Sequence, residues 1–87
     1  MVANVTLDTR RDCHLCDEAR AMLADCRRRL HAEVREVDVD SNAVLVERFG
    51  DSIPVIVIEW GAVLLWPFTR AAVRAAVQRG MQHGNQR

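Results

Sequence analysis

The sequence predicts a small α/β domain in which a mixed four-stranded sheet carries helices on both faces. Apolar residues recur at strand spacing and then at helical spacing, and the alternation continues in the order β-α-β-α-β-β-α. Residues 53–58 form an almost unbroken β-branched run, which is typical of a central strand covered on both faces. With 87 residues, the chain is expected to form one domain over 1–87, with a frayed tail from about residue 81.

The first three elements follow from the spacing of apolar residues. Residues 3–7 alternate apolar and polar side chains and predict a short strand, and residues 8–12 read as a charged loop. Apolar positions at helical spacing from residue 14 to about 31 predict a long helix. Valines separated by charged residues over 34–39 predict a second strand that is exposed on one face.

A second helix is expected between Asp40 and Gly50. Asp40 or Ser41 can cap its amino end, since their short polar side chains accept hydrogen bonds from free backbone N–H groups. Gly50 marks its carboxyl end. The side chains expected to face inward are Val44, Leu45 and Phe49.

The last three elements are a hairpin and a helix. Residues 53–58 and 62–66 are expected to pair across a turn at 60–61, and Pro67 ends the second of these strands. Thr69 is then placed to cap the final helix. A right-handed β-α-β unit makes the first two strands parallel. The expected buried face of the final helix consists of Ala72, Val73, Ala76 and Val77.

The charge and hydropathy of the chain exclude several classes of partner. Twelve basic and twelve acidic residues give a net charge of zero, which argues against nucleic acid or anionic lipid as the main ligand. No segment approaches the roughly 20 apolar residues of a membrane span, and the first residues lack the pattern of a secretory signal. We therefore expect a cytoplasmic protein without a membrane partner, and a monomer.

Chemistry is expected at two cysteines, Cys13 and Cys16, where the first strand gives way to the first helix. A thiolate at Cys13 would face the free N–H groups of the first helical turn. Such a setting can lower a thiol pKa from about 8.5 to between about 3.5 and 7.5, so Cys13 is expected to be the better nucleophile. Cys16 lies near enough to attack a mixed disulfide on Cys13 and close an internal disulfide.

The charges around the pair act in opposite directions. Arg10, Arg11 and a protonated His14 would stabilise a thiolate at Cys13, whereas three neighbouring acids would disfavour it. The sequence leaves the net shift open, and His14 fits an exposed turn residue as well as a tuning role. The three acids are Asp12, Asp17 and Glu18.

Two other readings of the pair stay open. One is a protein-binding module without redox turnover, and the other is a metal or iron–sulfur carrier. The metal alternative is disfavoured because a structural zinc site needs four ligands, and no second Cys/His pair follows at a suitable spacing. Cys26 lies ten residues beyond Cys16, about 15 Å along a continuous helix, and is expected to be a buried small hydrophobe. Spacing alone predicts a trans peptide before Pro54.

The motif Thr9-Arg10…Asp12-Cys13-His14-Leu15-Cys16-Asp17-Glu18-Ala19, with Ile53-Pro54-Val55 and Trp66-Pro67-Phe68, resembles the glutaredoxin branch of the thioredoxin superfamily. More narrowly, it is similar to a family of short bacterial glutaredoxin-like proteins. The resemblance implies the strand order 2-1-3-4, with Cys13 as the attacking thiol and Cys16 as the resolving thiol. It also implies a cis-proline at Pro54, lying against the dithiol, with the backbone of Ile53 presented to the bound partner.

The resemblance therefore predicts a thiol–disulfide oxidoreductase that acts on a protein disulfide or a low-molecular-weight thiol. Ile53, Pro54, Arg10, Arg11 and His14 are the expected substrate-binding residues, and neither a metal nor a bound cofactor is expected. Two features depart from the family pattern. His14-Leu15 replaces the common Pro-Tyr between the cysteines, and residues 66–69 replace the glycine pair that precedes the glutathione-carboxylate site. The second departure weakens the case for glutathione, although Arg10 and Arg11 could attract its carboxylates.

Overall fold

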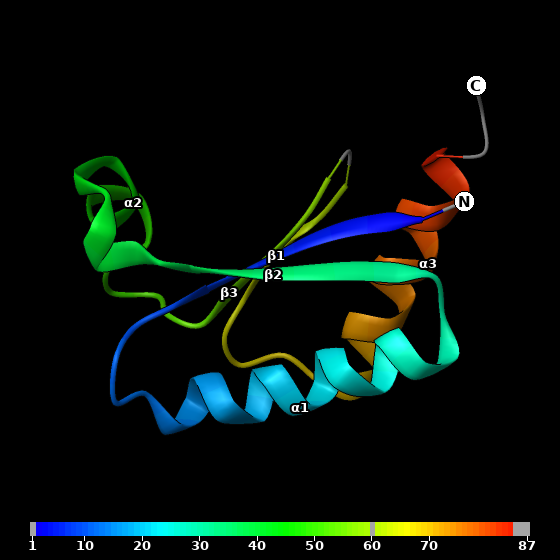
Figure 1. The fold of residues 1–87 in the computed structure, drawn as a ribbon, viewed down its shortest axis with the longest axis horizontal. Coiled ribbons are helices and arrows are strands. Elements are labelled where there is room, and N and C mark those ends of the chain that lie inside the picture. Colours follow the sequence, from blue (N-terminus) through cyan, green and yellow to red (C-terminus); the bar gives the residue numbers. More distant parts are fainter. Residues whose placement is uncertain (1, 60, 85–87) are drawn as a thin grey trace.

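The computed structural model describes residues 2–59 and 61–84 and confirms the predicted α/β fold (Figure 1). The four strands lie in the order β2-β1-β3-β4, as the resemblance implied. The described elements are β1 (Ala3–Thr9), α1 (His14–Arg29), β2 (Ala32–Asp38), the short 3-10 helix η1 (Val39–Ser41), α2 (Ala43–Phe49), β3 (Val55–Ile58), β4 (Val63–Leu65) and α3 (Arg70–Gly84).

The strand pairing places all chain segments around the cysteines at one end of the sheet. β1 and β2 run parallel, from Ala3 opposite Ala32 to Thr9 opposite Asp38. β3 runs antiparallel to β1, with Asp8 opposite Val55, and β4 completes the hairpin. The carboxyl ends of β1 and β2 therefore meet the amino end of β3. Figure 1 shows α2 and the start of α1 at this end and α3 at the other.

The core lies between the sheet and the two long helices. α1 and α3 pack on one side of the sheet, and α2 lies on the opposite side near its end (Figure 1). Alternate side chains of β1 point into this core, where they meet the inner faces of α1 and α3. The fully buried side chains of this cluster include Val5, Leu7, Leu23, Ile56, Val73 and Val77.

β1 is longer than its sequence predicts, because Asp8 and Thr9 belong to the strand and are buried. β1 is flanked by β2 and β3, so both neighbours extend its hydrogen-bonded ladder past Leu7. The Thr9 hydroxyl donates to the carbonyl of Val37 at 3.4 Å, which satisfies one of the two buried polar side chains. Burial raises the pKa of Asp8, and the nearby Arg48 offsets part of that effect.

The prediction for the second helix was wrong in its cap and in its buried face. Residues 39–41 form η1, and Asn42 caps α2 by accepting from Val44 N–H at 2.9 Å and Leu45 N–H at 3.3 Å. α2 has no buried residue, and the side chain of Val44 is 61% exposed. The reason is that α2 contacts mainly η1 and does not lie across the sheet.

The cap of α3 was predicted correctly, since Thr69 Oγ1 accepts from Ala72 N–H at 3.1 Å. Ala72 itself is exposed, contrary to the prediction. The helix continues past Gly80, beyond its expected end, and Gly80 itself is buried against β3. A Cβ at Gly80 would lie 2.7 Å from Ile58 Cγ2, so this close contact requires glycine. The rest of the predicted tail, at 85–87, and Trp60 of the predicted turn lie outside the described residues.

Candidate dithiol site

Cys13 is the N-cap residue of α1, as its position in the sequence predicts. Its backbone is extended, at φ −110° and ψ 100°, and Cys16 N–H donates to Cys13 Sγ at 3.2 Å. The same N–H lies 3.1 Å from the Cys13 carbonyl oxygen. The sulfur of Cys13 therefore sits where a helix offers unpaired N–H groups and the positive end of its dipole, both of which stabilise negative charge.

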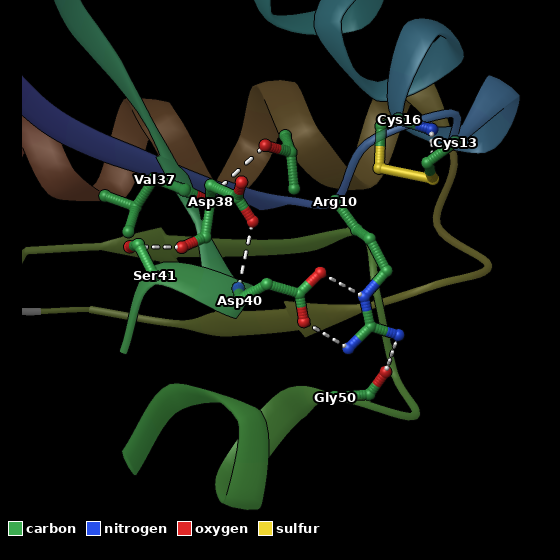
Figure 2. Close-up of polar contacts among 9 residues, drawn as sticks. Arg10, Cys13, Cys16, Val37, Asp38, Asp40, Ser41 and Gly50 are labelled. Atoms are coloured by element: carbon green, nitrogen blue, oxygen red, sulfur yellow. Dashed lines mark hydrogen bonds and ion pairs between the residues drawn. A yellow bond between two sulfur atoms is a disulfide. The ribbon is translucent and has the colours of Figure 1, made fainter. Parts of the chain in front are cut away.

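The two cysteines form a disulfide in this structure, with their Cα atoms 5.2 Å apart (Figure 2). Cys13 is half-buried, whereas the side chain of Cys16 is only 1% exposed. The difference in exposure makes Cys13 the sulfur that an incoming group meets first. Cys16 is reached through Cys13.

The turn that leads from β1 into α1 depends on Asp12. Asp12 is the one non-glycine residue of the described chain with a positive φ, at 56°. Aspartate and asparagine tolerate this left-handed conformation better than most residues. Asp12 thus helps to place Cys13 at the helix start, and it leaves its own carboxylate exposed beside the sulfur.

The Ile53–Pro54 peptide is cis, so the family resemblance gave the correct isomer and spacing alone did not. Pro54 is buried and Ile53 is half-buried. Ile53 and Cys13 both line one open groove of about 300 Å³. The structure therefore brings the residue before the cis-proline next to the dithiol. A second cis peptide, Trp66–Pro67, was not foreseen.

A second open groove, of about 700 Å³, is also lined by Cys13. Its lining combines the end of β1, the turn into α1 and the end of β2. Arg11 and His14 line both grooves, and both side chains are exposed. Two of the expected binding residues therefore lie beside Cys13 and face solvent.

Arg10 also lies beside Cys13, but its guanidinium is turned toward two distant segments (Figure 2). Nε and Nη2 donate to the two carboxylate oxygens of Asp40, each at 3.0 Å, and Nη1 donates to the Gly50 carbonyl at 3.0 Å. We call this arrangement the Arg10 clasp. It ties the turn before Cys13 to η1 and to the segment that leads into Ile53. No local signal predicts it, because Asp40 and Gly50 are thirty or more residues away along the chain.

Arg20 is similarly engaged on the first half of α1. It donates to Asp17 at 2.5 Å and to the two oxygens of Glu36 at 2.6 and 2.7 Å. These contacts raise the pKa of Arg20 and lower the pKa of Glu36. The ion pairs hold α1 against β2 at the side of the larger groove.

Cys26 is separate from the dithiol, as the sequence predicts. Its thiol is free and buried, and burial raises its pKa above the ordinary thiol value. It belongs to the core cluster beneath the sheet.

Within the part of the chain that the structure describes, no three His, Cys, Asp or Glu side chains come together as a metal-binding group, and no helix is long and apolar enough to cross a membrane.

The ring of Trp66 packs toward the protein interior. Trp66 is half-buried against the core, and its ring meets that of Phe68 edge to face, with centroids 5.0 Å apart. Trp66 therefore lies with Phe68 where glutaredoxins carry a glycine pair, and it fills this position with apolar side chains.

The four-stranded sheet, the cysteine pair at the start of α1 and the cis-proline define a glutaredoxin-like protein of the thioredoxin superfamily. More particularly, the chain belongs to the family described as "Glutaredoxin-like domain (DUF836)", which matches residues 4–78. This family and the cysteine pair fit a thiol-redox role.

Two solved structures are similar to the chain over most of its length. The X-ray structure of protein XcR50 from X. campestris is 38% identical, with a TM-score of 0.71, and the match covers 82% of this chain and 91% of that one. The solution structure of XcR50 gives the same identity, a TM-score of 0.68, and coverage of 82% and 87%. No curated protein matches the chain.

Proposed function

We propose that this protein is a thiol–disulfide oxidoreductase that exchanges disulfides through Cys13 and Cys16. The observation that carries the proposal is the position of Cys13. Its sulfur is accessible at the N-cap of α1, accepts a hydrogen bond from Cys16 N–H at 3.2 Å, and lies within bonding reach of a second, shielded sulfur. A thiolate in this position is stabilised, and its resolving partner is already in place.

In the reduced protein, the Cys13 thiolate attacks one sulfur of a substrate disulfide. A bond forms between Cys13 Sγ and that sulfur, and the other sulfur leaves as a thiolate. The Cys16 thiolate then attacks Cys13 Sγ, which forms the Cys13–Cys16 disulfide and releases the second substrate thiolate. Two electrons pass from the protein to the substrate, and a dithiol reductant returns the protein to its starting state. No bound cofactor takes part.

The groove between Cys13 and Ile53 is the proposed place for the polypeptide or small molecule around the substrate disulfide. Its walls come from the turn before α1 and from the segment before Pro54. The backbone of Ile53 offers hydrogen-bonding groups to an extended chain, and Arg11 and His14 border the same space. In this proposal, Arg10 acts on the substrate through the shape of the groove, since its guanidinium is already bound.

Single cysteine variants test the proposal. With bis(2-hydroxyethyl) disulfide as substrate and dithiothreitol as reductant, Cys13→Ser should abolish turnover above the uncatalysed rate. When the reduced Cys16→Ser variant is freed of dithiothreitol and mixed with the disulfide alone, it should accumulate a mixed disulfide on Cys13, visible as the added mass of one substrate half. Cys26→Ser is the matched control, because its thiol is buried away from the site. Turnover that survives Cys13→Ser would refute the proposal.

A further inference from the structure

Although the net charge of the chain is zero, its acidic and basic residues are concentrated at opposite ends of the molecule. We use the term dithiol end for residues 8–20 and 36–53, which lie together around the cysteines and α2 (Figure 1). This end holds nine Asp or Glu residues against four Arg. The rest of the described chain holds three Asp or Glu against seven Arg. The redox site therefore lies at the acidic end of a molecule about 34 Å long.

Two of the four arginines at the dithiol end are already held in ion pairs. Arg10 is bound to Asp40, and Arg20 is bound to Asp17 and Glu36. Within residues 2–59 and 61–84, Arg11 is the groove-lining arginine that forms no ion pair. The linings of the two grooves also contain three acidic residues that pair with no arginine in the described chain: Asp12, Asp38 and Asp51.

These acids surround the reactive sulfur instead of lying on a remote face. Asp12 precedes Cys13 directly and lines both grooves, Asp38 lines the larger groove, and Asp51 lines the one beside Ile53. The side chains of Asp12, Asp38 and Asp51 are all exposed, so their charges act on any group that approaches Cys13. Charge of one sign around a cleft attracts ligands of the opposite sign and repels those of its own.

We propose that the substrates of this site are disulfides with positively charged groups near the sulfurs, such as those in basic polypeptide segments. Anionic disulfides, glutathione disulfide among them, are repelled. This inference rests on the proposed function and names its substrate class. The chemistry stays as described above: Cys13 and Cys16 together give two electrons to the substrate disulfide, and the charge selects which disulfide reaches Cys13.

Three small disulfides of similar size test the inference: cystamine, which is cationic, bis(2-hydroxyethyl) disulfide, which is neutral, and 3,3′-dithiodipropionate, which is anionic. The rate constant for oxidation of the reduced protein is measured with each. It is then divided by the rate constant for dithiothreitol and the same disulfide, which removes differences in intrinsic reactivity. We expect the corrected cation-to-anion ratio to be about ten or more at 10 mM ionic strength. At 1 M salt the screening length is about 3 Å, and the ratio should approach one.

Matched variants test whether the acidic residues that line the grooves cause the preference for cationic disulfides. Asp12→Asn keeps a residue that tolerates the positive φ, and Asp38→Asn keeps an oxygen to accept from Asp40 N–H. Each should lower the ratio by about two- to fivefold, the effect of one charge roughly 8 Å away in water. Glu33→Gln removes an exposed acid from β2 outside the dithiol end and should leave the ratio unchanged. The ratio cancels any change in the reactivity of Cys13 itself.

The outcomes separate this inference from the proposed function. If the neutral disulfide is reduced but the corrected ratio is one or less, or does not respond to salt, the inference is wrong and the function stands. If Glu33→Gln lowers the ratio as much as Asp12→Asn, the groove acids are not its source, and the inference is again wrong. If none of the three disulfides is reduced, the proposed function itself fails.

Discussion

The Arg10 clasp gives a quantitative prediction that connects stability to substrate binding. Arg10 and Asp40 are 38% and 50% exposed, so their ion pair contributes at most about 1 kcal/mol. The hydrogen bond to the Gly50 carbonyl adds about 1 kcal/mol. Arg10→Ala should therefore lower the free energy of unfolding by about 1–2 kcal/mol. In a domain of this size, that loss lowers Tm by about 4–15 °C.

The functional effect of the same variant should depend on the substrate. The clasp holds the segment that leads into Ile53 against the turn before Cys13, so its loss frees one wall of the groove. We expect KM for an extended peptide disulfide to rise about fivefold, which corresponds to about 1 kcal/mol. The rate with bis(2-hydroxyethyl) disulfide, which is too small to use the whole groove, should change by less than about twofold.

Calorimetric or urea unfolding and steady-state kinetics measure both effects. A cycle with Arg10→Ala, Asp40→Ala and the double variant should give a coupling energy of about 0.5–1 kcal/mol. Arg11→Ala is the stability control, because Arg11 is exposed and should cost less than about 0.5 kcal/mol. A coupling energy near zero, or equal losses from Arg10→Ala and Arg11→Ala, would show that the clasp does not join these segments in solution.

Two further predictions concern the sheet. Burial raises the pKa of Asp8 above its unfolded value, so the folded state binds that proton more tightly and stability falls as pH rises through the raised pKa. Asp8→Asn should raise the free energy of unfolding at pH 7, where the buried carboxylate is charged, and leave it unchanged near pH 3; a gain that is equal at both pH values would contradict this reasoning. Gly80→Ala should gain about 1 kcal/mol of helix propensity but place a Cβ 2.7 Å from Ile58 Cγ2. Because overpacking costs about 1–3 kcal/mol, a net loss of Tm is expected, and a rise would mean that β3 moves aside at little cost.

The sequence was sufficient for the element order and for the position of the cysteines, because both depend on local spacing. Apolar periodicity separates strands from helices, and a cysteine at a helix start needs no distant partner to be recognised. The length of β1, in contrast, could not be predicted from local spacing. Asp8 and Thr9 look like loop residues, and only pairing with β2 and β3, which follow much later in the chain, keeps them in the strand.

The parts of the site that sequence reasoning missed all depend on contacts between distant segments. Arg10 carries the same charge in the sequence whether it binds a substrate or Asp40, and only the fold brings Asp40 within 3.0 Å of it. The cap of α2 was missed for a related reason. Several residues that can cap a helix follow one another there, and the 3-10 turn of η1 leaves Asn42 in the capping position.

Redox titration of the Cys13–Cys16 pair tests the central claim most directly. The protein is equilibrated in buffers between about −120 and −300 mV, an interval that includes the potentials of related dithiol proteins, about −120 to −270 mV. Free thiols are then alkylated under denaturing conditions and assigned by peptide mass spectrometry. We expect one reversible two-electron transition in which Cys13 and Cys16 lose their thiols together, while Cys26 is alkylated throughout. A Cys13–Cys16 pair that remains fully reduced across this range would contradict the account.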